Sequence, residues 1–285
     1  MDKGRCSVHE IKMVLRSLSL FVGTGECNGR CKHCAGIPLR KYAPKKDGIV
    51  DEDLIYRTIR ECYDKGARSL SISSSGEPTL SPLAVTKTLR LVNGCREEGI
   101  GFSPINLYSN GIRIGEDSDF CKKYLGLWKE LGLTHVYVTV HNVDEKKNAR
   151  IYGIESYPSL KLILDRIHNA NLLMRANLVL SKGTIGSFEE FVFTSEHLRK
   201  IGVDFISAWP IRTLDDRVDY ERGPSEEELD KMEEWIRETG DVGVRLLREK
   251  SKVRYERGEK LTLFPNGSLT NNWCNYRENL KGGVK

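Results

Sequence analysis

Strand-like and helical segments alternate along most of this chain, and this alternation restricts the fold more than any other feature. Apolar and polar residues alternate within the strand segments, while the segments between them show helical periodicity. A repeated strand–helix order predicts βαβ units and a parallel sheet. We expect strands at 17–22, 69–74, 104–109, 135–141, 172–180 and 205–209, and helices at 51–65, 82–98, 119–131, 157–170, 188–201 and 226–239.

Each expected strand has one apolar face and one polar face, because side chains alternate across a strand with period two. Leu70 and Ile72 share a face of the second strand and serines occupy the other; Arg175 and Asn177 share the polar face of the fifth. A complete TIM barrel fills its interior with branched apolar residues, which serines cannot replace. The pattern predicts an α/β fold, a partial (β/α)6 barrel of parallel strands around a polar cavity. A flat sheet with one solvated face is the alternative.

A short tail follows the last expected helix. The stretch LTLFPNGSLT at 261–270 predicts a β-hairpin that turns at Asn266 and Gly267. Because no linker or low-complexity tract divides the chain, we expect a barrel core at 1–240. The remaining residues, 241–285, are expected to form a C-terminal hairpin and tail that pack on the barrel without being an independent domain.

Composition argues against a dedicated nucleic-acid binder and a membrane protein, and it indicates the cytoplasm as the compartment. The net charge of +5 is small for a dedicated nucleic-acid binder. No run approaches the roughly 18 apolar residues that span a bilayer, and the polar N-terminus does not resemble a secretory signal. We therefore expect a cytoplasmic protein without a membrane partner, in which closely spaced cysteines indicate metal binding or catalysis rather than disulfides.

Three of the eight cysteines, Cys27, Cys31 and Cys34, stand together in CNGRCKHC. A structural zinc site usually needs four ligands in two separated pairs. A [4Fe–4S] cluster is normally held by four thiolates, so three would leave one iron open to an external ligand. His33 precedes a candidate ligand and is expected to point away from the metal. Cys62 and the other helical cysteines are expected to be buried and inert.

The C-x3-C-x2-C loop after the first strand resembles that of the radical S-adenosylmethionine (SAM) superfamily. The resemblance implies a [4Fe–4S] cluster on Cys27, Cys31 and Cys34 whose open iron binds SAM. Reductive cleavage of SAM would give a 5′-deoxyadenosyl radical that abstracts hydrogen from a substrate. A second motif, Ser75-Gly76-Glu77-Pro78, resembles the family's GGEP segment, whose backbone meets the amino group of SAM, with Ser75 in place of the first glycine.

Further segments resemble the maturase and molybdopterin-precursor cyclase branch of this superfamily, and they imply additional contacts with SAM. Arg175 is a candidate partner for the carboxylate of SAM or for an anionic substrate. Each assignment competes with an ordinary structural role, such as a strand former, a buried amide or a core aromatic residue. The implied SAM contacts are Ser109, Asn110, Thr139, Asn177 and Trp209.

The substrate is less constrained than the cofactors. The chain lacks the additional C-terminal cysteines of the branch's auxiliary clusters, and we expect a small metabolite or peptide as substrate. An RNA substrate is an alternative, because the segment after the thiols carries Arg40, Lys41, Lys45 and Lys46. The resemblance also implies a low-potential electron donor of the ferredoxin or flavodoxin type. Candidate substrate-contacting or catalytic residues are His141, Arg212 and Cys274.

Two other classes remain open from the residues alone. An iron–sulfur electron-transfer or sensor protein would bind a cluster without cleaving SAM, but such a protein would usually supply a fourth thiolate. A zinc-stabilised binding module would need a histidine to join the thiol ligands.

Overall fold

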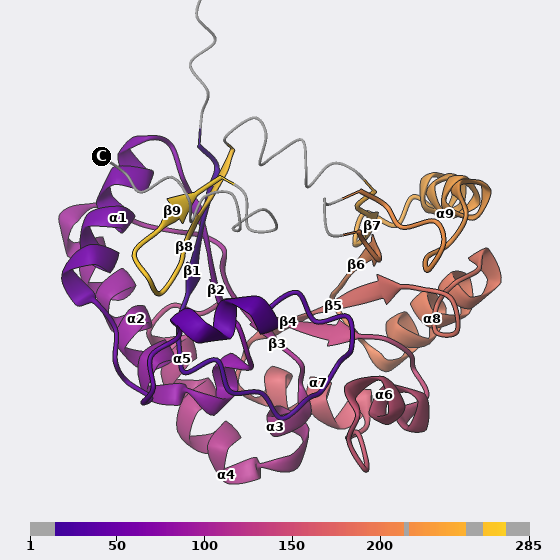
Figure 1. Ribbon diagram of the computed structural model, residues 1–285, viewed down its shortest axis with the longest axis horizontal. Coiled ribbons are helices and arrows are strands. Elements are labelled where there is room, and N and C mark those ends of the chain that lie inside the picture. The colour runs from indigo at the N-terminus through magenta and orange to yellow at the C-terminus, as the bar shows by residue number, and fades with distance from the viewer. Residues whose placement is uncertain (1–14, 214–216, 249–258, 272–285) are drawn as a thin grey trace, which may run out of the picture.

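In the computed structural model, which describes residues 15–213, 217–248 and 259–271, the strands form one sheet (Figure 1). Its order is β7-β6-β5-β4-β3-β2-β1-β8-β9. Neighbouring strands are parallel from β7 to β8, and β8 and β9 are antiparallel. The strands are β1 Ser17–Phe21, β2 Ser69–Ser73, β3 Ile105–Ser109, β4 His135–Val140, β5 Leu173–Leu180, β6 Phe205–Pro210, β7 Val244–Leu246, β8 Lys260–Leu263 and β9 Leu269–Thr270.

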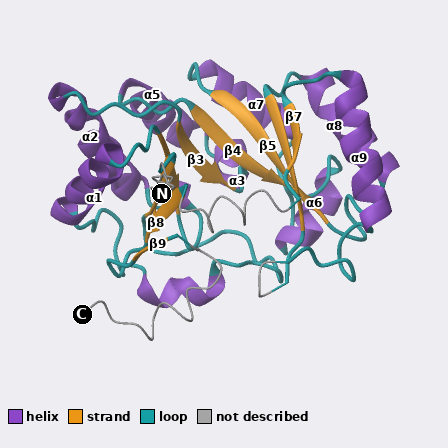
Figure 2. Cartoon of the chain, turned by 90° about the horizontal axis from the view of Figure 1, so that it is seen from above, coloured by secondary structure: helices purple, strands orange, loops and turns teal. Residues whose placement is uncertain are grey.

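Helices cover the outer side of the curved sheet, where Figure 2 shows α1, α2, α5, α7, α8 and α9. The α-helices are α1 Glu52–Asp64, α2 Pro82–Gly94, α3 Ile112–Glu116, α4 Ser118–Phe120, α5 Gly126–Glu130, α6 Glu145–Tyr152, α7 Leu160–Asn169, α8 Phe188–Ile201 and α9 Glu226–Thr239. Short 3-10 helices are η1 Ile37–Tyr42, η2 Pro78–Leu80 and η3 Cys95–Glu98, and η4 Cys121–Leu125 is a π-helical turn.

The expected helices are present, with two differences. The helix expected at 119–131 consists of α4, η4 and α5 in succession. Four short helices, η1, η2, α3 and α6, were not predicted because they are too short to show a helical period. Local capping defines α6 instead: the Asp144 side chain accepts from the Lys147 amide, and Gly153 ends the helix in the left-handed conformation.

The apolar faces of the strands form the core against these helices. Leu18, Leu70, Leu107, Val138 and Leu178 are each 0% exposed. Burying a side chain of this kind stabilises the fold by about 1.5–3 kcal/mol. The predicted division of each strand into an apolar and a polar face therefore explains why the helices lie on one side of the sheet.

The opposite face of the sheet is polar, as predicted, but much of it is buried. Ser19, Ser71, Asn106, Asn177 and Ser207 are at most 7% exposed. The interior is therefore less open to solvent than the cavity expected from the sequence. Larger side chains, including Tyr137, which is 8% exposed, also occupy this face. A period-two pattern cannot reveal how far such side chains fill the interior.

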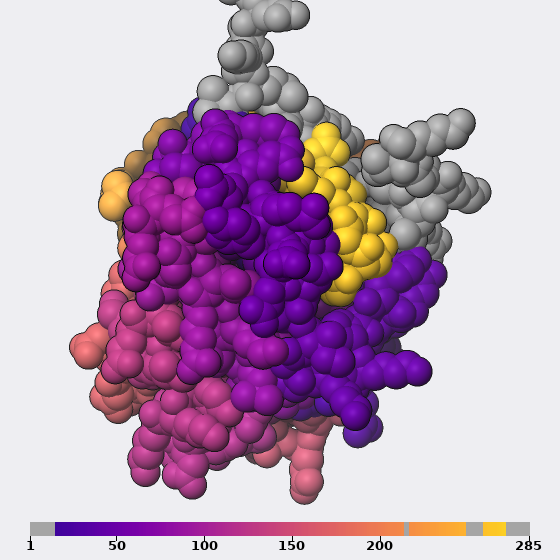
Figure 3. Space-filling view, turned by 90° about the vertical axis from the view of Figure 1, so that its left-hand side faces the viewer, coloured from indigo at the N-terminus to yellow at the C-terminus, as the bar shows by residue number. Residues whose placement is uncertain are grey.

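The C-terminal segment returns to the beginning of the sheet. Figure 3 shows the yellow C-terminal segment lying against indigo and purple parts of the chain. There β8 pairs in parallel with β1, and the rings of Phe21 and Phe264 are 5.0 Å apart. The predicted hairpin is confirmed by the antiparallel pairing of β8 and β9. The predicted α/β fold and partial barrel are also confirmed, with β7 and β8 extending the six expected strands at both edges. No described helix is long and apolar enough to cross a membrane.

Candidate active site

The thiol loop, residues 23–36, follows β1 and carries Cys27, Cys31 and Cys34, all of them half-buried. Burial raises the pKa of Cys31 to about 12, and the neighbouring Cys34 and Cys27 add to this effect. Burial likewise raises the pKa of Cys27. Neighbouring thiols that resist ionisation individually are suited to a cationic iron–sulfur cluster, which compensates the charge of several thiolates at once. This donor set fits the cluster that the sequence predicts.

The three helical cysteines have the surroundings predicted for them. Cys62, Cys95 and Cys121 are buried in the apolar core. Burial raises the pKa of each thiol. Unlike the thiols of the loop, these three lie on separate elements, α1, η3 and η4, so they are not placed to hold one cluster together.

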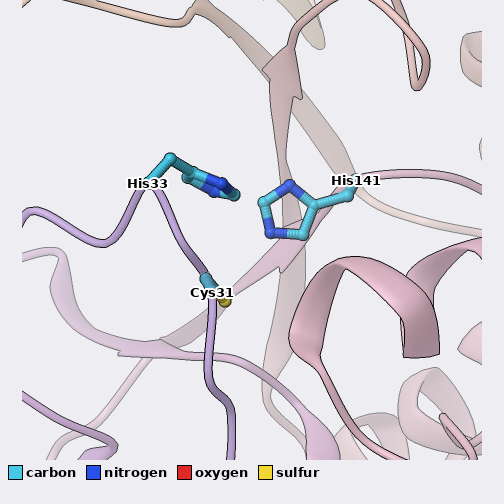
Figure 4. A group of neighbouring side chains, drawn as sticks. All are labelled: Cys31, His33 and His141. Carbon is cyan, nitrogen blue, oxygen red and sulfur yellow. The ribbon is translucent and has the colours of Figure 1, made fainter.

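His33 does not point away from the thiols, and this expectation was wrong. Ligand atoms of Cys31, His33 and His141 lie within 4.8 Å of one another (Figure 4). The rings of His33 and His141 meet edge to face with centroids 4.9 Å apart. The His33 ring is directed toward His141, the residue after β4. The position of His33 next to Cys34 in the sequence could not indicate this contact. This arrangement supplies the histidines that the zinc alternative required.

His141, a candidate substrate-contacting residue, is 2% exposed at the end of β4. Burial lowers its pKa to about 3, and His33 contributes to the same shift. Its ring is therefore neutral at neutral pH. Its Nδ1 is buried without a hydrogen-bond partner among the described residues. An unpaired buried nitrogen of this kind is suited to a bound ligand that can supply a hydrogen bond.

The GEP segment, residues 75–78, packs directly on the thiol loop through backbone contacts. The Glu77 amide donates to the Glu26 carbonyl at 2.7 Å. A Cβ at Gly76 would lie 2.1 Å from the Glu26 oxygen, and one at Gly36 would lie 2.4 Å from the Ser75 oxygen. Only glycine permits these approaches. The two motifs that the sequence singled out are thereby brought together.

The Glu77 side chain has a role that sequence reasoning missed. It is 2% exposed, and its Oε1 accepts from the Thr79 amide at 3.1 Å, the Thr79 hydroxyl at 2.8 Å and the Ser109 hydroxyl at 2.9 Å. Its Oε2 accepts from the Asn110 amide at 2.7 Å. Burial raises the pKa of this carboxyl, although these donors oppose the shift. Glu77 therefore connects the GEP segment to the end of β3.

Asn110, expected near SAM, contacts the thiol loop. Its Nδ2 lies 3.7 Å from Cys27 Sγ and 2.7 Å from Asn28 Oδ1. The structure thus brings together the ends of β1, β2 and β3 around the candidate ligands. Ser75, whose hydroxyl is buried without a partner among the described residues, and Pro78, buried at the start of η2, belong to the same assembly.

A second group lies on the interior face of β3, β4 and β5, and we call it the arginine cluster: Tyr108, Tyr137, Arg175 and Asn177. The Arg175 guanidinium lies 3.5 Å from the Tyr137 ring centroid, and its Nε donates to Asn177 Oδ1 at 2.9 Å. Tyr108 and Tyr137 meet edge to face at 5.1 Å. Burial alone would raise the pKa of Tyr108, but Lys260 and Arg175 outweigh it and lower that pKa. The cluster therefore provides positive charge on an aromatic support.

The remaining candidates have separate environments. The Thr139 carbonyl accepts from the Tyr152 hydroxyl at 2.8 Å, and Trp209 is half-buried in β6 opposite Val179.

Arg212 pairs with Val218 in an isolated bridge and donates to the Arg248 carbonyl, so it joins the loop after β6 to the segment after β7. Cys274 lies outside the described residues.

Structural comparisons agree on a family fold. Streptococcus suis SuiB bound to precursor peptide SuiA matches 93% of this chain and 61% of its own at 15% identity, with a TM-score of 0.64. Methylornithine synthase (PylB) matches 97% of this chain and 80% of its own at 16% identity, with a TM-score of 0.58. A third structure, native anSMEcpe with bound AdoMet, has a TM-score of 0.57 over 90% of this chain and 74% of its own, at 14% identity. These identities show the fold alone.

Curated relatives include GTP 3′,8-cyclases of Actinobacillus and Haemophilus species. The one from Actinobacillus succinogenes is 28% identical over 164 residues, covering 56% of this chain and 44% of the relative. The one from Haemophilus influenzae strain 86-028NP is 24% identical over 196 residues, covering 67% and 53%. The chain spans about half the length of these relatives.

The family itself is identified over most of the chain. The family model of the radical SAM superfamily matches residues 21–222. This range contains the thiol loop, the GEP segment and the arginine cluster. The chain therefore belongs to the radical SAM superfamily of enzymes, which use a [4Fe–4S] cluster and SAM.

Proposed function

We propose that Cys27, Cys31 and Cys34 hold the [4Fe–4S] cluster of this enzyme and that the GEP segment helps to bind SAM beside it. The observation that carries this proposal is the backbone packing of Gly76 and Glu77 against the thiol loop. When bound, the cluster and SAM supply a 5′-deoxyadenosyl radical that abstracts a hydrogen atom from the substrate. Membership of an enzyme superfamily sets aside the electron-transfer and sensor alternatives.

The chain's own residues position the reactants. Glu77 holds the end of β3 against η2, so Ser109 and Asn110 keep their places beside the thiol loop. The neutral ring of His141 presents an unpaired nitrogen in a buried setting. We also propose that SAM contacts Thr139, Asn177 and Trp209, since these residues belong to the interior face of β4, β5 and β6.

We propose a small metabolite or a peptide with an anionic group as the substrate. Arg175 supports the anionic character, because its charge lies on the polar interior face above Tyr137. GTP is a specific candidate, since the curated relatives described above are GTP 3′,8-cyclases. A peptide is the alternative suggested by SuiB, which was crystallised with its precursor peptide. RNA remains a third candidate through the exposed Lys41, Lys45 and Lys46.

The enzyme also requires an electron donor. We propose a low-potential ferredoxin or flavodoxin, as the family membership suggests. Comparing 5′-deoxyadenosine formation with a reduced ferredoxin or flavodoxin in place of a chemical reductant measures the contribution of the donor. Dithionite serves as a chemical reductant where the protein donor is unknown.

The test is formation of 5′-deoxyadenosine by anaerobically reconstituted protein given SAM and dithionite. A variant with Cys27, Cys31 and Cys34 changed to alanine should lose both the iron–sulfur absorbance and the product. The matched control, Cys62→Ala, removes a buried core thiol outside the loop and should retain the cluster. Zinc without iron in the wild-type protein, or product formation that survives the triple substitution, would contradict the proposal. GTP, peptides and RNA are then ranked by how strongly each stimulates the product.

A further inference from the structure

Asn110 makes a contact that goes beyond the assignment of cluster ligands: its side-chain amide faces a thiol sulfur. Its Nδ2 lies 3.7 Å from Cys27 Sγ, although the two residues are 83 positions apart. We propose that Asn110 is a positioning residue that raises the reduction potential of the cluster by donating a hydrogen bond to Cys27. This inference rests on the proposed ligation of the cluster by Cys27.

The orientation of the Asn110 amide is determined by its other partners. Its Oδ1 accepts from the Ile112 backbone amide at 3.0 Å, so the opposite end of the side chain carries the hydrogens. One of these hydrogens is directed to Asn28 Oδ1 at 2.7 Å. The other is available for Cys27 Sγ. Rotating the side chain by half a turn would place its oxygen against the Asn28 oxygen and the sulfur, which is unfavourable.

The backbone of Asn110 is held as firmly as its side chain. Its amide donates to Glu77 Oε2 at 2.7 Å, and its carbonyl accepts from the Tyr157 hydroxyl at 2.8 Å. Asn110 is 8% exposed. Water therefore cannot readily take the place of the amide at the sulfur.

Cys27 differs from the other two thiols of the loop. Its sulfur also accepts from the Gly29 backbone amide at 3.4 Å. No side chain among the described residues donates a hydrogen bond to Cys31 or Cys34. The proposed cluster therefore has one ligand with two N–H donors, one of which is a side chain that can be replaced.

The physical effect of such a donor has a definite sign. Reduction adds negative charge to an iron–sulfur cluster and its thiolates, and an N–H dipole directed at a sulfur stabilises the more negative state. Loss of the donor should therefore lower the reduction potential. Outer-sphere hydrogen bonds are a known means of tuning a metal site. We expect the ratio of reduced to oxidised cluster, at a fixed potential, to fall about tenfold, which corresponds to about 59 mV for one electron.

The experiment is a redox titration of the whole reconstituted chain, in which the electron paramagnetic resonance signal of the reduced cluster is measured at each potential. Asn110→Leu removes both hydrogens at similar volume. Asn110→Asp keeps the acceptor for Ile112 but places a carboxylate oxygen near the sulfur, so it should lower the potential further. Tyr157→Phe is the matched control, because it removes one backbone partner of Asn110 while Glu77, Ile112 and Asn28 still hold the amide beside Cys27. Its potential should equal that of the wild type.

The outcomes separate this inference from the proposed function. A lower potential in both Asn110 variants, with an unchanged Tyr157→Phe control, supports the inference. If Asn110→Leu fails to assemble a cluster, the Asn110→Asp variant decides the matter by the same measurement. An unchanged potential in the Asn110 variants that assemble, or failure of both to assemble, overturns the inference while the wild-type cluster upholds the proposed function. A wild-type protein without a cluster overturns both.

Discussion

The thiol loop and the arginine cluster lie on the same barrel but are held in different ways. Backbone atoms join the thiol loop to the GEP segment, and the approaches at Gly36 and Gly76 leave no space for a side chain. In the arginine cluster, the paired strands place Tyr108, Tyr137 and Arg175 side by side, and the contacts on the interior face are made by side chains.

This difference indicates how the two regions can vary. A backbone contact depends on small residues and a particular path of the chain, so it is suited to a cofactor that is always the same. A side-chain contact changes with each substitution, so it is suited to a substrate that differs among enzymes on one fold. We therefore expect damage to the first region to affect cluster assembly, and loss of Arg175 in the second to affect substrate use.

The largest effect is expected from Gly76→Ala. The new Cβ would meet the Glu26 and Gly25 carbonyl oxygens at 2.1 and 2.3 Å, and backbone atoms cannot rotate away. We expect destabilisation of about 3 kcal/mol and loss of most of the bound iron. Chemical denaturation and iron analysis measure these effects. Gly94→Ala is the control, because nothing lies within 4 Å of its Cβ; similar losses in both variants would refute the steric argument.

A smaller effect is expected from Glu77→Ala. This change leaves the amides of Thr79 and Asn110 and the hydroxyl of Ser109 without their shared acceptor. We expect a loss of about 2–3 kcal/mol in the free energy of unfolding. Urea denaturation provides the measurement. Glu77→Gln retains one acceptor and should lose less than the alanine variant, and the reverse order would count against this role.

The pH dependence of the same position has a definite sign. Burial raises the pKa of Glu77 above its ordinary value of 4.5. Between that value and the raised pKa, the folded protein binds more protons than the unfolded chain, so the stability that Glu77 contributes falls as pH rises. The stability of the wild type relative to Glu77→Gln should therefore be lower at about pH 8 than at about pH 5. A constant difference in denaturation experiments would show that the carboxyl does not change its charge in this window.

Arg175→Ala tests the second region. We expect the iron content to remain unchanged, because Arg175 contacts Tyr137 and Asn177 and does not touch the thiol loop. The concentration of an anionic substrate needed for half-maximal stimulation of 5′-deoxyadenosine should rise about tenfold, as for one lost interaction of about 1.4 kcal/mol. Arg175→Lys keeps the charge and should be intermediate. Loss of the cluster in Arg175→Ala would remove the distinction between the two regions.

Ser75→Gly should have the smallest effect. The Ser75 hydroxyl is buried without a hydrogen-bond partner among the described residues, so its removal relieves a cost that offsets the added freedom of glycine. We expect a change in stability below about 1 kcal/mol and an unchanged iron content. Thermal denaturation and iron analysis suffice. A large loss would show that the hydroxyl supports the GEP segment in a way that glycine cannot.

Local pattern explains much of what could be predicted. The period of two in strands such as β2 and β5 identified the apolar face, since burial of Leu70 and Leu178 follows from that period. The loop motif and the GEP segment pointed to one family, and the family is confirmed. His33 was placed wrongly and the Glu77 side chain was missed, because both depend on partners from other strands.

The sequence by itself determined the order of strands and helices, the apolar face of the sheet and the thiol spacing, because each of these depends on neighbours along the chain. Only the tertiary structure decided that β8 lies beside β1, that His33 meets His141 and that Asn110 faces Cys27. These contacts join distant segments, and their geometry results from the packing of the whole sheet and its loops. The pattern of residues within one strand or helix does not indicate which distant residues will meet.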